Sequence, residues 1–245
     1  AVDFMAQSAA ILNPDKEVVI PRAGARCPMA QMLTPEVVEA YRRRYPSLPL
    51  VVYVNSLAET KALADICCTS ANAVKVVESL NSDRVLFGPD RNLAEYVASR
   101  TGKEVIPVPE WGFCPVHVMY DSKCVEEARA AHPDAVFMAH PECPPEVLEK
   151  ADYVGSTSQM VRYAKQSSAS EFVVATEIGL LHRLRKENPS KRFFPAVEDA
   201  LCVNMKANRL LDVVECLAGG GHRVVVEPKV AERARKALEK MFEVS

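Results

Sequence analysis

The sequence predicts an α/β protein with small parallel sheets, repeated three times along the chain. Short segments rich in Val and Ile alternate with segments of helical periodicity, which is typical of parallel sheets covered on both faces. Three segments, 16–27, 103–114 and 191–202, align without gaps, and each opens with Lys and ends in Cys. Those cysteines are spaced by 87 and 88 residues, which indicates a repeated domain.

The middle repeat shows the expected order of elements. A strand rich in Val is followed by helix, short strand, helix, strand, helix and strand, with Thr69 or Ser70 expected to cap the second helix. The predicted ranges in this order are 48–56, 56–65, 66–68, 69–80, 84–89, 92–102 and 103–109. Each unit is therefore a small α/β domain with about four parallel strands.

The same order returns later in the chain. Residues 51–74 align with 138–161, and residues 82–103 align with 170–191. Residues 222–245 are predicted to form a strand and a helix that pack onto the first unit. The expected division is a first domain from 1–29 plus 208–245, a second from 30–116 and a third from 117–207.

Composition excludes several classes of protein. The chain has 245 residues, of which 49% are hydrophobic and 25% charged, with a formal net charge of -2. This is ordinary globular composition without a basic footprint for nucleic acid. No apolar run reaches the ~18 residues of a membrane span, and the first ten residues do not resemble a secretory signal. We therefore expect a cytoplasmic protein that binds neither nucleic acid nor membrane.

Polar residues gather where predicted strands end. Ligands bind at the carboxyl ends of the strands in open parallel sheets. Seven residues occupy such positions: Tyr53, Asn55, Ser70, His140, Glu142, Ser156 and Thr157.

Five of these positions also have a simpler interpretation. His140 and Glu142 could be a solvated strand end, although they align with Tyr53 and Asn55 in the repeat. The hydroxyl residues could be only helix caps, which is compatible with binding phosphate or carboxylate at a helix N-terminus.

The three equivalent cysteines are candidate metal ligands. If the units pack about a pseudo-three-fold axis, Cys27, Cys114 and Cys202 meet at one point. Three thiolates favour a soft metal or an iron–sulfur cluster. A zinc site is the alternative, with His117 as a fourth ligand. Buried, inert thiols that repeat because the domain repeats are the remaining possibility.

Motifs along nearly the whole chain resemble the quinolinate synthase family. They include VDFMAQSAAILNPDK, GARCPMA, VVYVNS, CCTSANAV, FGPDRNLAEYV, WGFCPVH, AHPEC, DYVGSTSQM, TEIGLLHRL and ALCVNMK, in the family's order. The resemblance implies three αβα domains about a pseudo-three-fold axis with the active site at the centre. It also implies a [4Fe–4S] cluster held by Cys27, Cys114 and Cys202, with one iron open as a Lewis acid.

The resemblance further implies the reaction and the roles of the site residues. The family condenses iminoaspartate with dihydroxyacetone phosphate to quinolinate, with loss of phosphate and water. Glu142 would transfer a proton in a late dehydration. Tyr53 and Asn55 would contact the triose-derived part, and Ser70 the phosphate. The dicarboxylate part would be held by the remaining three residues: His140, Ser156 and Thr157.

One departure from the family concerns the N-terminus. Ala1 aligns with Gly88, so about 50 residues of the first unit are expected to precede this sequence, including residues that line the family's active site. Residues 1–245 alone are therefore expected to be inactive, with the N-terminal segment as a possible separate partner. A non-catalytic iron–sulfur or zinc protein, such as a redox sensor, is the alternative function.

Overall fold

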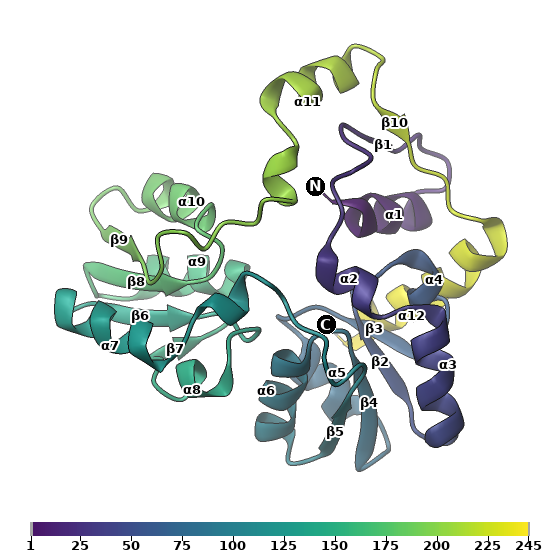
Figure 1. Ribbon diagram of the computed structural model, residues 1–245, viewed down its shortest axis with the longest axis horizontal. Helices are drawn as coiled ribbons and strands as arrows, with labels where there is room; N and C mark the ends of the chain where they lie inside the picture. Colours follow the sequence, from purple (N-terminus) through teal and green to yellow (C-terminus); the bar gives the residue numbers. More distant parts are fainter. Residues whose placement is uncertain (1, 245) are drawn as a thin grey trace. The chain divides into compact units, whose positions relative to one another are not determined.

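The computed structural model describes residues 2–244 and confirms a mixed α/β fold with small parallel sheets (Figure 1). The chain forms two compact units. Unit 1 comprises residues 1–112 and 203–245, and unit 2 comprises residues 113–202. The predicted division into three domains stays a prediction.

Unit 1 contains a four-stranded parallel sheet in the order β3-β2-β4-β5. Its elements, in chain order, are α3 (Pro35–Arg44), β2 (Leu50–Tyr53), α4 (Ala58–Lys61), β3 (Ile66–Cys68), α5 (Ala73–Ser79), β4 (Arg84–Gly88), α6 (Arg91–Thr101) and β5 (Glu104–Pro107). Leu50, Val51 and Val52 of β2 are buried because the sheet is covered on both faces.

Unit 2 repeats this topology with a parallel sheet in the order β7-β6-β8-β9. Its elements are η1 (His117–Met119), α7 (Ser122–Ala131), β6 (Val136–Ala139), α8 (Pro145–Leu148), β7 (Tyr153–Val154), α9 (Thr157–Gln166), β8 (Glu171–Ala175), α10 (Leu180–Glu187) and β9 (Arg192–Pro195). The alternation of strands and helices read from the sequence is confirmed in both sheets.

Paired contacts show the repeat at the level of single side chains. Asp65 accepts a hydrogen bond from the backbone N–H at the start of β2 (2.7 Å) and lies 2.9 Å from Arg42. At the matching place in unit 2, Asp152 accepts from a backbone N–H of β6 (2.8 Å) and lies 3.0 Å from Arg129. Each Asp side chain therefore connects the turn before the edge strand (β3 or β7) with the neighbouring strand (β2 or β6).

The lysines that open the second and third aligned segments have a structural role. The Lys103 ammonium donates to backbone carbonyls at the end of α5, including that of Leu80 (2.6 Å). The Lys191 ammonium donates to those of Ala164 (2.6 Å) and Ser167 (2.5 Å) at the end of α9. A cation near a helix C-terminus satisfies its last carbonyls and opposes the negative end of the helix dipole.

The chain ends contribute a different arrangement to unit 1. They form α1 (Asp3–Leu12), β1 (Val19–Ile20), α2 (Pro28–Met32), η2 (Met205–Ala207), α11 (Leu210–Leu217), β10 (His222–Arg223) and α12 (Pro228–Val244). β1 pairs antiparallel with β10, so the first aligned segment is not a strand of a parallel sheet. The predicted C-terminal strand and helix are present, and α12 packs on α4 and β3 as well as on α1.

The start of α5 differs from the prediction. Neither Thr69 nor Ser70 caps the helix, which begins at Ala73 after Asn72. The Asn72 Oδ1 atom accepts from the Thr69 backbone N–H (2.7 Å) and hydroxyl (2.8 Å) and so closes a turn over 69–72. An Asn side chain bonded to local backbone competes with helix formation, and here the helix starts two or three residues later than predicted.

The described helices include none with the length and apolar character needed to span a membrane.

Candidate functional site

Polar residues in unit 2 collect at the carboxyl ends of three neighbouring strands. His140 and Glu142 follow β6, Ser156 and Thr157 follow β7, and Thr176 follows β8. Four of these five side chains are buried, and Thr157 is exposed. Parallel strands end at one edge of the sheet, so this edge of unit 2 offers a shielded polar site.

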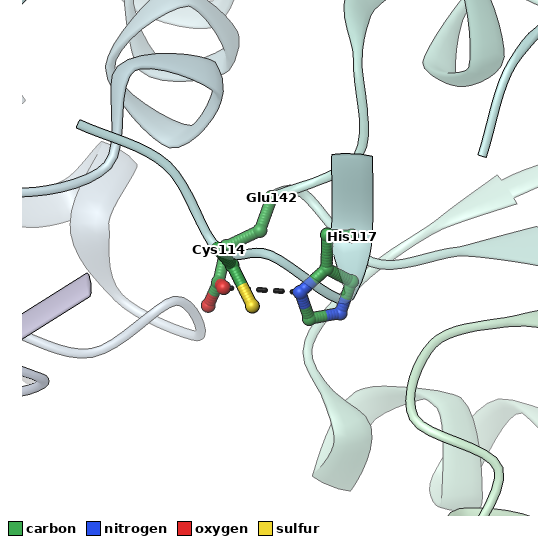
Figure 2. A group of neighbouring side chains, drawn as sticks. All are labelled: Cys114, His117 and Glu142. Atoms are coloured by element: carbon green, nitrogen blue, oxygen red, sulfur yellow. Dashed lines mark ion pairs between the residues drawn. The ribbon is translucent and has the colours of Figure 1, made fainter. Parts of the chain in front are cut away.

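Cys114, His117 and Glu142 form a compact group at this edge (Figure 2). One ligand atom from each residue lies within 4.8 Å of the other two. The His117 Nδ1 atom is 3.1 Å from a Glu142 carboxylate oxygen. His117 is 7% exposed and Glu142 2%, while Cys114 is partly exposed. A thiol, an imidazole nitrogen and a carboxylate are the side-chain groups that bind zinc and iron in proteins.

The His117 ring is held from its far side. Its Nε2 atom lies 2.9 Å from the Thr176 hydroxyl oxygen, and the Tyr120 hydroxyl donates to the Thr176 carbonyl at 2.7 Å. In contrast, Nδ1 makes no hydrogen bond of acceptable geometry with any residue in 2–244, although the Glu142 carboxylate is close. The ring therefore directs Nδ1 toward Cys114 and Glu142.

His140 orients Glu142 from the other side. The Glu142 backbone N–H donates to His140 Nδ1 at 3.3 Å, and the two histidine rings stack with centroids 4.6 Å apart. Burial lowers the pKa of His140 to about 3, more than the Glu142 carboxylate raises it. His140 is therefore a neutral ring at physiological pH, and it packs beside a buried carboxylate without a charge of its own.

Ser156 and Thr157 start α9. The Ser156 hydroxyl accepts from the Gln159 backbone N–H (3.4 Å), and the Gln159 side chain accepts from the Ser156 backbone N–H (2.8 Å). This reciprocal capping box satisfies two backbone groups at the helix start. The structure therefore confirms the simpler interpretation of Ser156, that it is a helix cap.

The candidate residues of unit 1 lie at the carboxyl ends of β2 and β3. Tyr53 is the last residue of β2 and pairs in register with the last residue of β3. Tyr53 is buried, and Asn55 and Ser70, in the loops that follow, are partly exposed. Ser56 donates to the Tyr53 carbonyl, and the buried Lys61 donates to the Ser56 carbonyl, so the loop is fastened from within.

The three candidate ligand cysteines occupy matching places. Each lies seven residues after the end of a strand (β1, β5 or β9) and is partly exposed. Cys27 belongs to unit 1 and precedes α2. Cys114 and Cys202 belong to unit 2 and pack against the same hydrophobic core.

The buried cysteines are a contrasting group. Burial raises the pKa of Cys67 to about 12, and it raises that of Cys68 well above its usual value. Cys124 and Cys143 lie in the core of unit 2. A thiolate is the form that binds metal, and an apolar setting opposes it. The donor chemistry therefore opposes metal binding by these four buried thiols, whereas Cys27, Cys114, Cys202 and Cys216 are partly exposed.

Two residues at these sites carry no signal in the sequence that we used. Thr176 holds His117 but stands in the repeat without a polar counterpart. Lys61 reads as one more charged residue on a helix, yet it is fully buried. The position of Thr176 directly after β8 is the signal that would have found it.

Comparisons with known proteins agree along the whole chain. Residues 1–243 match the family model described as "Quinolinate synthetase A protein". A quinolinate synthase of Thermotoga maritima is 50% identical over 243 residues, which is 99% of this chain and 81% of that protein. One from Pyrococcus horikoshii is 52% identical over 244 residues, covering 100% and 81%. One from Methanoregula boonei is 52% identical over 242 residues, covering 98% and 79%.

Proposed function

Because this chain belongs to the quinolinate synthase family, enzymes of NAD biosynthesis, we propose that it makes quinolinate from iminoaspartate and dihydroxyacetone phosphate, with loss of phosphate and water. The observation that supports this most directly is Glu142. Its carboxylate is 2% exposed, is flanked by two imidazoles and lies beside Cys114. A shielded carboxylate next to a metal ligand is suited to moving protons during dehydration.

Cys27, Cys114 and Cys202 are the proposed ligands of a [4Fe–4S] cluster. Their partial exposure and matching positions support this choice, and the buried state of Cys67 and Cys68 opposes the alternatives. When bound, such a cluster with one iron not held by cysteine supplies a Lewis acid for a hydroxyl or carboxylate of the substrate. In this proposal each of three αβα domains contributes one of the cysteines, and the domains are related by a pseudo-three-fold axis. Their proposed bounds are 1–29 plus 208–245, 30–116 and 117–207.

In unit 2, a Glu142 carboxylate oxygen takes a proton from the substrate carbon next to the one that carries the leaving hydroxyl. A double bond forms between these carbons as the C–O bond breaks, and Glu142 gives the proton to the hydroxyl, which leaves as water. His140 is neutral with Nδ1 occupied by the Glu142 backbone N–H, so its other ring nitrogen is the one that donates to a substrate carboxylate. Ser156 and Thr157 contribute hydroxyl and backbone N–H groups at the start of α9. A helix start favours a negatively charged carboxylate.

In unit 1, Tyr53 and Asn55 contact the part of the substrate that derives from the triose. The hydrogen bonds from Ser56 and Lys61 hold the loop after β2 in place for that contact. Ser70 contacts the phosphate through its hydroxyl from the turn before α5. Its place outside the helix means that the helix dipole is not its main source of affinity.

The function is tested by quinolinate formation and by iron content in protein purified without oxygen. We expect about four iron and four sulfide per chain. Residues 1–245 alone are expected to be inactive, and adding the N-terminal segment of the Thermotoga maritima relative, fused or as a separate piece, is expected to produce quinolinate. Activity of 1–245 alone would contradict the first expectation. A protein that stays colourless and inactive with the added segment, after a chelator has removed zinc and iron and sulfide have been supplied without oxygen, would contradict the proposed function.

The role of Glu142 has a matched control. In the complemented protein, Glu142→Gln is expected to lower kcat at least ~100-fold, because the amide cannot take up the proton, while iron and sulfide stay unchanged. Glu146→Gln, on an exposed residue of α8 in the same segment, is expected to leave kcat unchanged. Equal effects of the two substitutions would exclude a specific role for Glu142.

A further inference from the structure

We propose that unit 2 by itself holds one divalent ion of the zinc type, bound by Cys114 Sγ, His117 Nδ1 and a Glu142 carboxylate oxygen. This binding mode is separate from the three-cysteine cluster, with which it shares Cys114. It needs no residue of unit 1, because all three ligands belong to residues 113–202. The ion fills the site when no cluster is present.

The orientation of His117 carries the proposal. With the proton on Nε2, which lies 2.9 Å from the Thr176 hydroxyl oxygen, Nδ1 presents a lone pair. That lone pair is 3.1 Å from a carboxylate oxygen, and Nδ1 has no hydrogen-bond partner among the described residues. In this tautomer the two lone pairs repel each other unless a cation lies between them, and the proposal places a metal ion there. A second hydrogen bond that fixes the ring and its tautomer is also the usual support of a metal-binding histidine.

The distances suit a zinc ion. Tetrahedral zinc holds nitrogen and oxygen ligands at about 2.0–2.2 Å, so two such ligands are about 3.3–3.5 Å apart. The separation between His117 Nδ1 and Glu142 is close to this value. All three ligand atoms lie within 4.8 Å of one another, so a small rotation of the partly exposed Cys114 side chain completes the set. Water takes the fourth position of a tetrahedral ion.

Burial and ligand charge favour a divalent ion at this site. Glu142 and His117 are buried, so the carboxylate is shielded from solvent cations and its charge favours a bound ion. The site therefore has two ordinarily anionic ligands, thiolate and carboxylate, and one neutral ligand, which match a divalent ion.

The consequence concerns cluster assembly and rests on the proposed function. Zinc bound in this mode engages Cys114, so it blocks one of the three cluster ligands. Protein made in zinc-rich medium is then expected to contain zinc in place of iron and to be reconstituted poorly until a chelator removes the ion.

Cobalt and zinc binding to the full chain test the inference without reference to turnover. Metal-free protein, prepared without oxygen, is titrated with Co²⁺, which reports thiolate ligation by a charge-transfer band, and then with Zn²⁺ as competitor. We expect one ion per chain. Cys114→Ser is expected to remove the charge-transfer band, and His117→Gln and Glu142→Gln to weaken binding at least ten-fold.

Cys27→Ser and Cys202→Ser are the matched controls, and both are expected to bind Co²⁺ like the unaltered chain. Circular dichroism of each variant verifies folding. If the controls lose the ion while His117→Gln keeps it, the ion is bound by the three cysteines and the inference is wrong. Absence of tight binding in the unaltered chain would also overturn it. Neither result affects the iron content and quinolinate formation that test the proposed function.

Discussion

Lys61 lies within the core of unit 1, where its ammonium donates to the Ser56 carbonyl and sits 5.5 Å from the centre of the Phe4 ring. Burial lowers the pKa of Lys61 from 10.5 to about 8. The unfolded chain therefore binds more protons than the folded chain between pH 8 and 10.5. The contribution of Lys61 to stability is fully present above pH 10.5 and is lost as the pH falls through 8.

Lys61→Met is expected to change the pH dependence of stability. Between pH 8 and 10.5 the free energy of unfolding of the unaltered chain should rise relative to that of the variant, by up to about 3 kcal/mol. Urea unfolding at several pH values measures the difference. The comparison with the variant is needed because the raised pKa of Cys67 and Cys68 lowers the free energy of unfolding as the pH rises above 9, which opposes the effect of Lys61. Lys75→Met, on an exposed lysine, should show no such trend.

At the residue scale, the sequence predicts which side chains belong to the candidate site better than it predicts how deeply a side chain is buried or which partners it contacts. Cys114 and Glu142 stand out because their repeat positions and family motifs mark them, and the structure brings them together. Thr176 and Lys61 do not stand out, because their importance comes from burial and from partners distant in sequence. Periodicity does not reveal a buried lysine in a four-residue helix, and the repeat does not reveal a threonine with no polar counterpart.

At the scale of elements, Ser156 combines two possible roles that one experiment separates. Ser156→Ala and Gln159→Ala each break one half of the capping box at the start of α9. Both are expected to lower the free energy of unfolding by about 1 kcal/mol. If Ser156 also binds the substrate carboxylate, Ser156→Ala alone should raise the KM for iminoaspartate in the complemented protein. Equal KM values in the two variants would show that Ser156 is only a cap.

Element boundaries are where prediction from the sequence is weakest. The order of strands and helices from β2 to β9 follows from Val-rich segments and helical periodicity, and it is correct. The predicted start of α5 is wrong by two or three residues because the Asn72 side chain accepts a hydrogen bond from the Thr69 backbone N–H. The first aligned segment becomes an antiparallel pair because β1 meets β10, which lies some two hundred residues later. The local pattern of apolar and polar residues shows neither the Asn72–Thr69 hydrogen bond nor the pairing of β1 with β10.

At the scale of the whole molecule, α11 exposes an apolar face. Leu210, Leu211 and Leu217 are 79%, 73% and 84% exposed. Leu211→Lys is therefore expected to change the free energy of unfolding by less than about 0.5 kcal/mol and to reduce aggregation in light scattering. Leu238→Ala, on a residue of α12 that is 1% exposed, should cost about 2–5 kcal/mol. A large loss of stability in Leu211→Lys would mean that α11 is packed in solution.

The interrupted path of the chain through unit 1 bears on how the protein emerges from the ribosome. Unit 2 is encoded entirely within residues 113–202, so it can fold as soon as that stretch has left the exit tunnel. Unit 1 is completed only by α12, which covers β3 and α4 and is synthesised after unit 2. Domains usually fold in the order of synthesis. Here residues 113–202 can complete their fold before unit 1 has received α12.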